Sequence, residues 1–592
     1  MEYFPDPNAP APAPAPREAS PRTSEAAASD SAPLDGARAA AAAAAAPLRS
    51  KWSSRTEFVL ATVGNCVGVG NVWRFPYLCY RNGGGSFLVP YLLALVFIGA
   101  PLFLLELALG QRFSLGATHA YGKLHRRFRG VGCAGTVMAY VCLMYYNVIL
   151  AWTVVYGCHA LRPGGVPWGD ARVDSERFWE RQVLHQSRGF EDFGKTGGPA
   201  SAPLALALVF SWACLFFATR RGVHSAGRVA YVAATAPYAI LVLLVVRGAT
   251  LKGAGTGLRY YLSPDAAKLR TPRPWLDAAN QIIYSLGVGT GQMIAFGSYN
   301  PRDEDVVTIS LGIAALNSCT SLVAGVAVFA MLGHKADRDG VGVGDVVASG
   351  EGLAFVAYPD GLASLPAAGL WAFVFFLMLF FLCLDSGMAM LECWTTMLRD
   401  FGVFSHDGEE RWRLLEGLSL RSQDVVVAAS CCCGFLGSLL FISRPGIYWF
   451  ALVDRYVMWG VFLVAVVECV GVAHVYGARR FAKDIEDATK TRVPAFFTLS
   501  WAYATPLLSL ALALVSFQAA FAESTYEGAR STASAKAVGF LLMVGPLLLM
   551  VGGAVDAQRA SPYCAVDKKA AVEMVPQTSP KRIRANSGAD VV

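Results

Sequence analysis

The chain has 592 residues, of which 55% are hydrophobic and 16% are charged, with a formal net charge of +7. Soluble domains carry about 25% charged residues, so this deficit indicates a surface that faces lipid rather than water. The basic residues lie in short loops between apolar stretches, which argues against nucleic acid as a partner and favours a protein embedded in a lipid bilayer.

The two ends of the chain differ in composition from the middle. Residues 1–48 are rich in Pro and Ala, contain no signal-peptide pattern, and are expected to form a disordered tail. Residues 557–592 are polar and are expected to form a second tail. Ser579-Pro580 and the terminal Asp590-Val591-Val592 are weak signals for a phosphorylation site and for a partner that binds the tail. The predicted membrane domain is therefore 49–556.

Twelve apolar segments follow one another within 49–556, each near the roughly 20 residues needed to cross a bilayer as a helix. Several exceed this length and are expected to tilt. The sequence thus predicts an all-α membrane protein with 12 transmembrane helices. The segments are 57–80, 87–112, 132–161, 203–219, 228–247, 275–299, 304–333, 367–399, 421–443, 446–474, 494–518 and 536–556.

Loop charge predicts the orientation of these segments. Clusters of Lys and Arg lie in the loops after segments two, four and ten, around 123–129, 220–228 and 479–483. Basic loops stay in the cytoplasm, so both termini are expected to be cytoplasmic. The alternate loops are longer and rich in Gly and Pro, as expected for the outside.

Two segments are interrupted by dense glycine. The first contains Gly64, Gly68 and Gly70 beside Asn65 and Asn71, and the sixth contains Ser285-Leu286-Gly287-Val288-Gly289-Thr290-Gly291. Each glycine destabilises a helix by about 1 kcal/mol, so both runs predict unwound backbone. Broken helices five segments apart are typical of two inverted five-helix repeats (5+5), with the binding site at the breaks.

Polar groups at these breaks suit ion binding. Unwound backbone offers carbonyl oxygens to cations, and half-helix N-termini offer N–H groups to anions. Asp385-Ser386 lies deep in the eighth apolar segment, where a carboxylate is costly and marks an ion path. The alternative for Asp385 is a structural pair with a nearby base.

Several motifs resemble one family. Residues 65–76, 82–85 and 298–300, with Asp385-Ser386, resemble the signature of the neurotransmitter:sodium symporters (solute carrier family 6). The resemblance covers about 49–475 and extends loosely to 556. It implies the fold of the bacterial leucine transporter. It also implies symport, coupled to Na⁺ and Cl⁻, of an amino acid or a related carboxylate-bearing solute by alternating access.

The resemblance implies two sodium sites. The first would use the Cys66 carbonyl with the side chains of Asn71, Ser285 and Asn317. The second would use the carbonyls of Gly64, Val67 and Leu382 with the side chains of Asp385 and Ser386. Both sets consist of oxygen atoms, which sodium prefers.

The resemblance also implies the substrate pocket. A substrate carboxylate would meet the N–H groups of Val69 and Gly70 and the Tyr146 hydroxyl. Gly68 replaces the aspartate of the monoamine carriers, which argues against monoamines. Gly387 and Thr290 would enlarge the pocket. The expected pocket residues are Asn65, Gly68, Val69, Gly70, Cys142, Tyr146, Tyr284, Gly287, Thr290, Gly387 and Met390.

Chloride dependence follows from a serine in the seventh segment. Chloride-independent members carry a carboxylate at the place of Ser321. The resemblance therefore implies an anion site of Tyr91, Gln281, Ser285 and Ser321. Ordinary hydrogen bonds between helices are the alternative.

The gates follow from the same comparison. Arg74 and Asp454 would pair on the outer side, with Tyr284 as the aromatic lid. On the inner side Arg49 and Asp400 would pair near Ser298 and Tyr299, with Trp52 packing the tail. Glu106 in the second segment would support the unwound part of the first as a protonated acid, unless it is a lone buried carboxyl with a water.

Two alternatives stay open at this point. A non-transporting nutrient receptor on the same scaffold would keep the pocket but lose part of the gates. A carrier of betaine, taurine or GABA would differ only in pocket length. An enzyme is not expected, since the sequence shows no nucleotide loop, metal cluster or triad pattern. The plasma membrane is the expected location, and the sequence predicts neither the substrate nor the oligomeric state.

Overall fold

A computed structural model describes residues 50–169, 174–187, 189–190, 201–222, 229–346, 353–403, 411–415, 418–522, 525–526 and 529–559. The tail 1–48, Arg49 and the tail from 560 lie outside the described residues. All described residues belong to one compact unit, 49–592.

The first apolar segment forms a helix, a break and a second helix. Helix α2 (Arg55–Cys66) begins at Ser54, whose hydroxyl accepts a hydrogen bond from the Glu57 N–H at 3.1 Å. The Glu57 carboxylate accepts from the Ser53 N–H at 2.7 Å, so two free N–H groups are satisfied at the helix start. After residues 67–69 the chain forms a π-helical turn, Gly70–Arg74, and then α3 (Phe75–Arg81).

The sixth segment is interrupted in the same way. Helix α13 (Pro272–Leu286) ends at Gly287, and α14 (Gln292–Ser298) begins after Gly291. Gly287, Gly289 and Gly291 all have positive φ, at 65°, 74° and 77°. A residue with a side chain is strained in that region, so the glycine run fixes the break. Both predicted interruptions are therefore seen.

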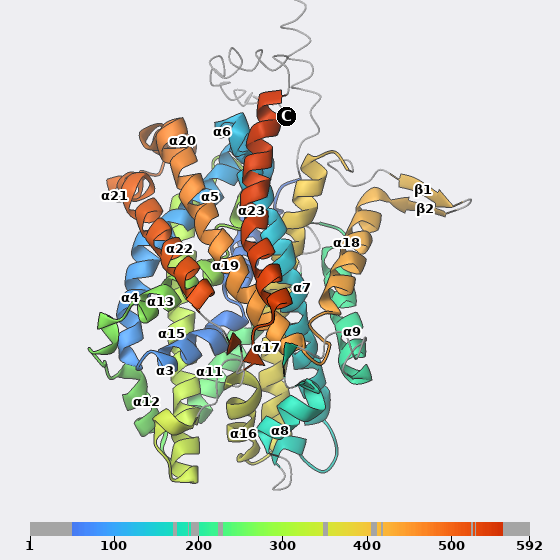
Figure 1. Cartoon of the computed structure of the whole chain (residues 1–592), viewed down its shortest axis with the longest axis vertical. Helices are drawn as coiled ribbons and strands as arrows, with labels where there is room; N and C mark the ends of the chain where they lie inside the picture. The colour runs from blue at the N-terminus through green and yellow to red at the C-terminus, as the bar shows by residue number, and fades with distance from the viewer. Residues whose placement is uncertain are drawn as a thin grey trace, which may run out of the picture. The chain divides into compact units, whose positions relative to one another are not determined.

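The remaining helices and strands complete the chain in order (Figure 1). The first half contains α4 (Leu88–Ala94), α5 (Ala100–Phe113), α6 (Ala117–Leu124), α7 (Arg129–Ala160), α8 (Ser175–Arg177), α9 (Ala202–Thr219), α11 (Ala236–Ala249) and α12 (Ala254–Leu262). The second half contains α15 (Val306–Asp339), α16 (Tyr358–Ala363), α17 (Ala368–Asp400), α18 (Ser422–Ser438), α19 (Gly446–Val470), α20 (Ala478–Thr489), α21 (Ala495–Leu499), α22 (Thr505–Ala522) and α23 (Ala533–Arg559).

Two short hairpins were not expected from the sequence. Strands β1 (Arg411–Leu415) and β2 (Leu418–Arg421) pair between α17 and α18, and in Figure 1 they extend away from the helices. Strands β3 (Thr525–Tyr526) and β4 (Ala529–Arg530) pair between α22 and α23. Both lie in connections between apolar helices, so the helical class of the protein is unchanged.

Nine helices in the described part of the chain are long and apolar enough to cross a membrane. Three of the twelve predicted segments are not among these nine helices. The first and sixth are split by their breaks, and α18 has 17 residues. Large apolar side chains such as Leu206, Phe217 and Leu541 are more than 60% exposed, as expected for surfaces that meet lipid.

The two broken segments lie inside the bundle. Helices α7 and α17 make its most extensive helix pair, α2 packs against α15 and α17, and α14 packs against α5. The polar side chains Asn71, Gln281 and Asn317 are completely buried among these helices. The breaks are thus enclosed by protein, which is where unwound backbone is tolerated in a membrane.

Candidate functional site

Side chains from both breaks meet at Ser285, near the end of α13. Its Oγ lies 3.0 Å from Asn317 Oδ1, 3.4 Å from Asn71 Oδ1 and 3.5 Å from the Cys66 carbonyl oxygen. The Asn71 amide donates to Asn317 Oδ1 at 2.8 Å. The structure therefore brings together all four groups of the first expected sodium site, and their oxygens are neutral.

A buried carboxylate faces the C-terminal part of α2. Asp385 is 4% exposed, its Oδ2 has no hydrogen-bond partner, and no base pairs with it within the described residues. A Cβ added at Gly64 would lie 1.7 Å from that Oδ2, so only glycine fits. Ser386 Oγ donates to the Leu382 and Asn65 carbonyls, each at 3.2 Å. An unpaired buried charge is costly, so this arrangement suits a bound cation.

Four of the five residues of the second expected sodium set are thus neighbours: Gly64, Leu382, Asp385 and Ser386. Within the described residues, no hydrogen bond joins the Val67 carbonyl to them. Val67 itself is buried directly after α2, where its N–H donates to the Val63 carbonyl at 2.7 Å.

The residues expected to bind chloride form part of the same network. Tyr91 donates to Ser321 Oγ at 3.3 Å, and the Asn71 amide donates to Ser321 Oγ at 2.8 Å. Gln281 donates to the Gly70 carbonyl at 3.0 Å, while its Oε1 has no partner in the described part of the chain. Hydroxyl and amide donors gathered in a buried site suit an anion.

A small cavity of about 20 Å³ lies between the breaks. Seven of the expected substrate residues line it, namely Asn65, Gly68, Gly70, Tyr146, Tyr284, Gly287 and Met390. Cys66, Asn71, Ser285 and Ser386, expected to bind sodium, also line it. The expected substrate and ion sites therefore share one wall.

Four expected pocket residues lie outside this lining. Thr290 donates to the Gly287 carbonyl at 2.7 Å, and Cys142 accepts from Tyr145 at 3.5 Å. Val69 lies in the first break. A Cβ at Gly387 would point at Leu215 of α9, 3.0 Å away, so the missing side chain adds no room to the cavity.

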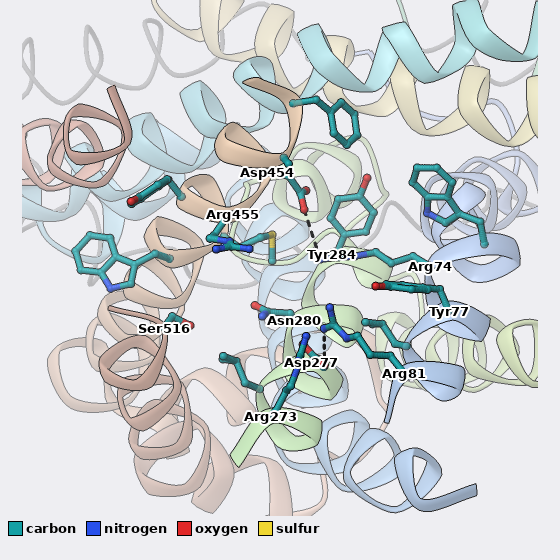
Figure 2. Close-up of a pocket in the computed structure, with 18 of the residues that line it drawn as sticks. Arg74, Tyr77, Arg81, Arg273, Asp277, Asn280, Tyr284, Asp454, Arg455 and Ser516 are labelled. Carbon is teal, nitrogen blue, oxygen red and sulfur yellow. Dashed lines mark hydrogen bonds and ion pairs between the residues drawn. The ribbon is translucent and has the colours of Figure 1, made fainter. Parts of the chain in front are cut away.

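A larger cavity of about 470 Å³ lies beyond Tyr284 (Figure 2). Arg74 and Asp454 face each other across it, with Nη2 and Oδ2 3.7 Å apart. The Arg74 guanidinium lies 4.7 Å from the centre of the Tyr284 ring, as a cation–π contact. The expected outer gate is therefore assembled, and the ion pair is partly exposed.

Comparison with known proteins identifies the family. The profile described as the sodium:neurotransmitter symporter family matches residues 49–174 and 168–557. The sodium- and chloride-dependent taurine transporter of Bos taurus is 38% identical over 78% of this chain and 77% of its own length. The Bos taurus sodium- and chloride-dependent GABA transporter 2 is also 38% identical, over 79% and 80%. The creatine transporter of Torpedo marmorata is 38% identical over 78% of this chain and 78% of its own length.

The chain belongs to the sodium:neurotransmitter symporter family. This confirms the resemblance seen in the motifs, and with the apolar helices it confirms an integral membrane protein. It also confirms that the chain is a transporter and not an enzyme, since the family consists of symporters.

The symporter is closed at the end that carries Trp52. The Trp52 indole donates to the Phe296 carbonyl at 3.2 Å, and its backbone N–H donates to the Tyr299 carbonyl at 3.1 Å. Lys51 donates to the Asn300 carbonyl at 2.7 Å. These contacts tie the start of the first segment to the end of the sixth. We refer to this closed end as the Trp52 end.

The expected inner pair is only partly described. Arg49 lies outside the described residues, and Asp400 Oδ2 accepts from the Gly116 N–H at 2.5 Å. Sequence reasoning missed a buried pair beside it. Arg399 and Glu392 lie 3.7 Å apart, and both contact the Tyr299 hydroxyl, at 2.7 Å each. An arginine in the last turn of an apolar segment was the signal that could have found this pair.

Glu106 contacts a different break from the one expected. The Gly289 N–H, in the break of the sixth segment, donates to Glu106 Oε1. No contact joins Glu106 to the first break within the described residues. The position of Glu106 on α5 explains this, because α5 packs along α14, directly after the sixth-segment break. Glu106 Oε1 therefore accepts a hydrogen bond from the sixth-segment break, and Glu106 Oε2 has no partner in the described part of the chain.

Proposed function

We propose that this symporter couples Na⁺ and Cl⁻ to the uptake of a small zwitterionic solute by alternating access. The observation that carries the proposal is the meeting of both breaks at Ser285, together with a buried Asp385 that pairs with no base among the described residues. A site of neutral oxygens with one unpaired carboxylate attracts cations, and ions bound there would hold the two breaks together.

Two sodium ions are proposed, as cargo rather than as resident cofactors. One would bind between Cys66, Asn71, Ser285 and Asn317. The other would bind between Gly64, Val67, Leu382, Asp385 and Ser386. The short distances around Ser285 and the partnerless oxygen of Asp385 support these assignments.

Chloride is proposed at Tyr91, Gln281, Ser285 and Ser321. Two sodium ions in a medium of low dielectric repel each other, and an anion beside them relieves that repulsion. The first sodium set and the anion set share Ser285, so the ions would stabilise one another. The sodium- and chloride-dependent relatives support both ions.

The substrate is proposed to bind its acid group at the first break. The N–H groups of Val69 and Gly70 and the Tyr146 hydroxyl are donors there, and Gly68 offers no carboxylate to an amine. A Cβ at Gly68 would lie 2.7 Å from Ser386 Oγ and 3.1 Å from the Tyr146 hydroxyl, so the wall is tight.

Two substrate classes remain candidates. An α-amino acid fits the family resemblance and the acid-binding break. The relatives named for taurine, GABA and creatine favour the second class. Taurine and GABA are zwitterions whose charged groups are separated by two or three carbons. Creatine bears a guanidinium in place of an amine. We favour this second class. A side chain at Gly387 would point at Leu215, so its absence does not provide the room that was expected for larger amino acids.

The proposed architecture is twelve spans with two inverted five-helix repeats over 49–556. The tails 1–48 and 557–592 and the Trp52 end would be cytoplasmic, in the plasma membrane. The cavity beyond Tyr284 would then be the entry path from outside. Arg74, Asp454 and Tyr284, which are in contact with one another here, would form the barrier between this cavity and the substrate. Opening the Trp52 end requires the Trp52 and Tyr299 contacts to separate.

Ligand binding to the purified protein tests the substrate class. A ligand that binds the folded state raises its thermal stability. The panel is taurine, GABA, creatine, betaine, alanine and leucine, each in sodium chloride and in choline chloride. We expect stabilisation by taurine, GABA or creatine in sodium chloride alone. Stabilisation by alanine or leucine alone would instead support the α-amino acid class, and equal shifts in choline chloride would contradict sodium coupling.

A further inference from the structure

A second acidic residue lies beside Glu106 and has no place in the proposed ion sites. Glu468 is on α19, three residues before the π-helical segment Gly471–Gly477. Glu106 and Glu468 are both 0% exposed. They are close enough to interact electrostatically. Two acids from different helices thus share one interior site.

The charges of this site are not compensated. Tyr121 of α6 donates to Glu468 Oε2, and the Gly289 N–H donates to Glu106 Oε1. Glu468 Oε1 and Glu106 Oε2 have no partner, and no Lys, Arg or His contacts either acid within the described residues. Among the described residues, the other titratable groups that interact with the pair are Cys393 of α17 and Cys469 of α19. None of these groups is cationic at neutral pH.

Two carboxylates cannot both be ionised at such a site. Burial and like charge each disfavour the second negative charge, and no base offsets it. A backbone N–H stabilises an ionised carboxylate, which favours the charge on Glu106. The Tyr121 hydroxyl can accept as well as donate, so it also suits a protonated partner at Glu468.

We propose that Glu468 binds a proton in the closed state seen here and releases it when the Trp52 end opens. The pair joins four elements: α5, α6, α19 and the break between α13 and α14. If these elements part and water enters, the ionised form is favoured. The closed state then binds one more proton than the open state, so alkaline solution favours opening.

Infrared spectroscopy of the full-length protein in lipid tests the proton itself. The C=O stretching band of a protonated carboxylic acid should be present at neutral pH, be lost in Glu468→Gln, and remain in the matched neighbour variant Cys469→Ser. Loss of the band in both Glu468→Gln and Cys469→Ser would overturn the assignment of the proton to Glu468. If the spectrum of Glu468→Gln differs from that of wild type only in the bands of ionised carboxylates, Glu468 carries no proton and the proposal is wrong.

Hydrogen exchange tests whether protonation of Glu468 is coupled to opening of the Trp52 end. This coupling rests on the proposed alternating access, whereas the infrared test of the proton is independent of it. Exchange of residues 50–66 and 287–300, corrected for the intrinsic effect of pH, should rise in wild type at alkaline pH. It should stay low in Glu468→Gln, whose amide is neutral at all pH values. If exchange rises equally in both proteins, opening is not coupled to the protonation of Glu468. The protonation itself, which the infrared test measures, would not be contradicted. A protein with the proton but no pH-dependent opening would indicate a purely structural pair.

Discussion

At the scale of single residues, Asp385 is central to the proposed binding of sodium. Its carboxylate is buried with no base beside it in the described part of the chain. Replacing Asp385 by Asn removes the charge and keeps the size. A hydrogen bond or ligand interaction of a charged group contributes about 1.5–3 kcal/mol, so sodium affinity should fall about 10- to 100-fold.

Thermal unfolding in sodium chloride and in choline chloride measures this loss. Asp385→Asn should lose the sodium-dependent stabilisation and, in choline chloride, be at least as stable as wild type. Asp424→Asn is the control, because Asp424 pairs with Arg421 at 3.0 Å in a partly exposed site. Unchanged sodium stabilisation in Asp385→Asn would contradict its proposed role.

Ser321 offers a second test at the residue scale. It lies 2.8 Å from the Asn71 amide and 3.3 Å from the Tyr91 hydroxyl. A glutamate here would place a fixed negative charge where chloride is proposed. Ser321→Glu should take up solute equally well in sodium chloride and sodium gluconate. Ser310→Ala should keep the chloride dependence, because this serine of α15 donates to the Val307 carbonyl and not to the anion site. Continued need for chloride in Ser321→Glu would count against the site.

At the scale of helices, α2 and α17 approach closely because Gly64 has no side chain. A methyl group there would lie 1.7 Å from Asp385 Oδ2. Gly64→Ala should therefore give less folded protein or no sodium binding. Gly157→Ala is the matched control, since nothing lies within 4 Å of its added methyl on α7 and alanine favours a helix by about 1 kcal/mol. Size-exclusion profiles and thermal unfolding compare the two, and equal behaviour would refute the close contact.

The helical breaks were predictable, and their partners were less so. Three glycines with positive φ end α13, and this signal is local in the sequence. The contact of Glu106 with Gly289 depends on how α5 packs, and the direction of Gly387 depends on α9. Neither packing is encoded in a single segment. The Arg399–Glu392 pair was missed because its residues lie seven apart, about two helical turns, beyond the three- or four-residue spacing typical of charge pairs within a helix.

At the scale of the whole molecule, the two ends differ. The Trp52 end is tied by backbone and side-chain hydrogen bonds, while a cavity of about 470 Å³ lies beyond Tyr284. Tyr299→Phe removes the hydroxyl that joins Glu392, Thr396 and Arg399. Unsatisfied buried groups cost about 1–3 kcal/mol, so the Trp52 end should open more often.

Hydrogen exchange of residues 292–300 reports that opening. It should rise in Tyr299→Phe and stay at the wild-type level in Tyr503→Phe, where the tyrosine is 60% exposed. If exchange were unchanged in Tyr299→Phe, the buried network would not hold this end closed.

Uptake by the whole protein in proteoliposomes tests sodium- and chloride-coupled symport most directly. Labelled taurine, GABA, creatine, betaine and α-amino acids are supplied in sodium chloride, choline chloride and sodium gluconate. We predict uptake of at least one of these solutes in sodium chloride and a loss of that uptake when either ion is replaced. Uptake that survives gluconate would contradict the anion site alone. Uptake indifferent to sodium, or binding without uptake, would contradict the proposed mechanism.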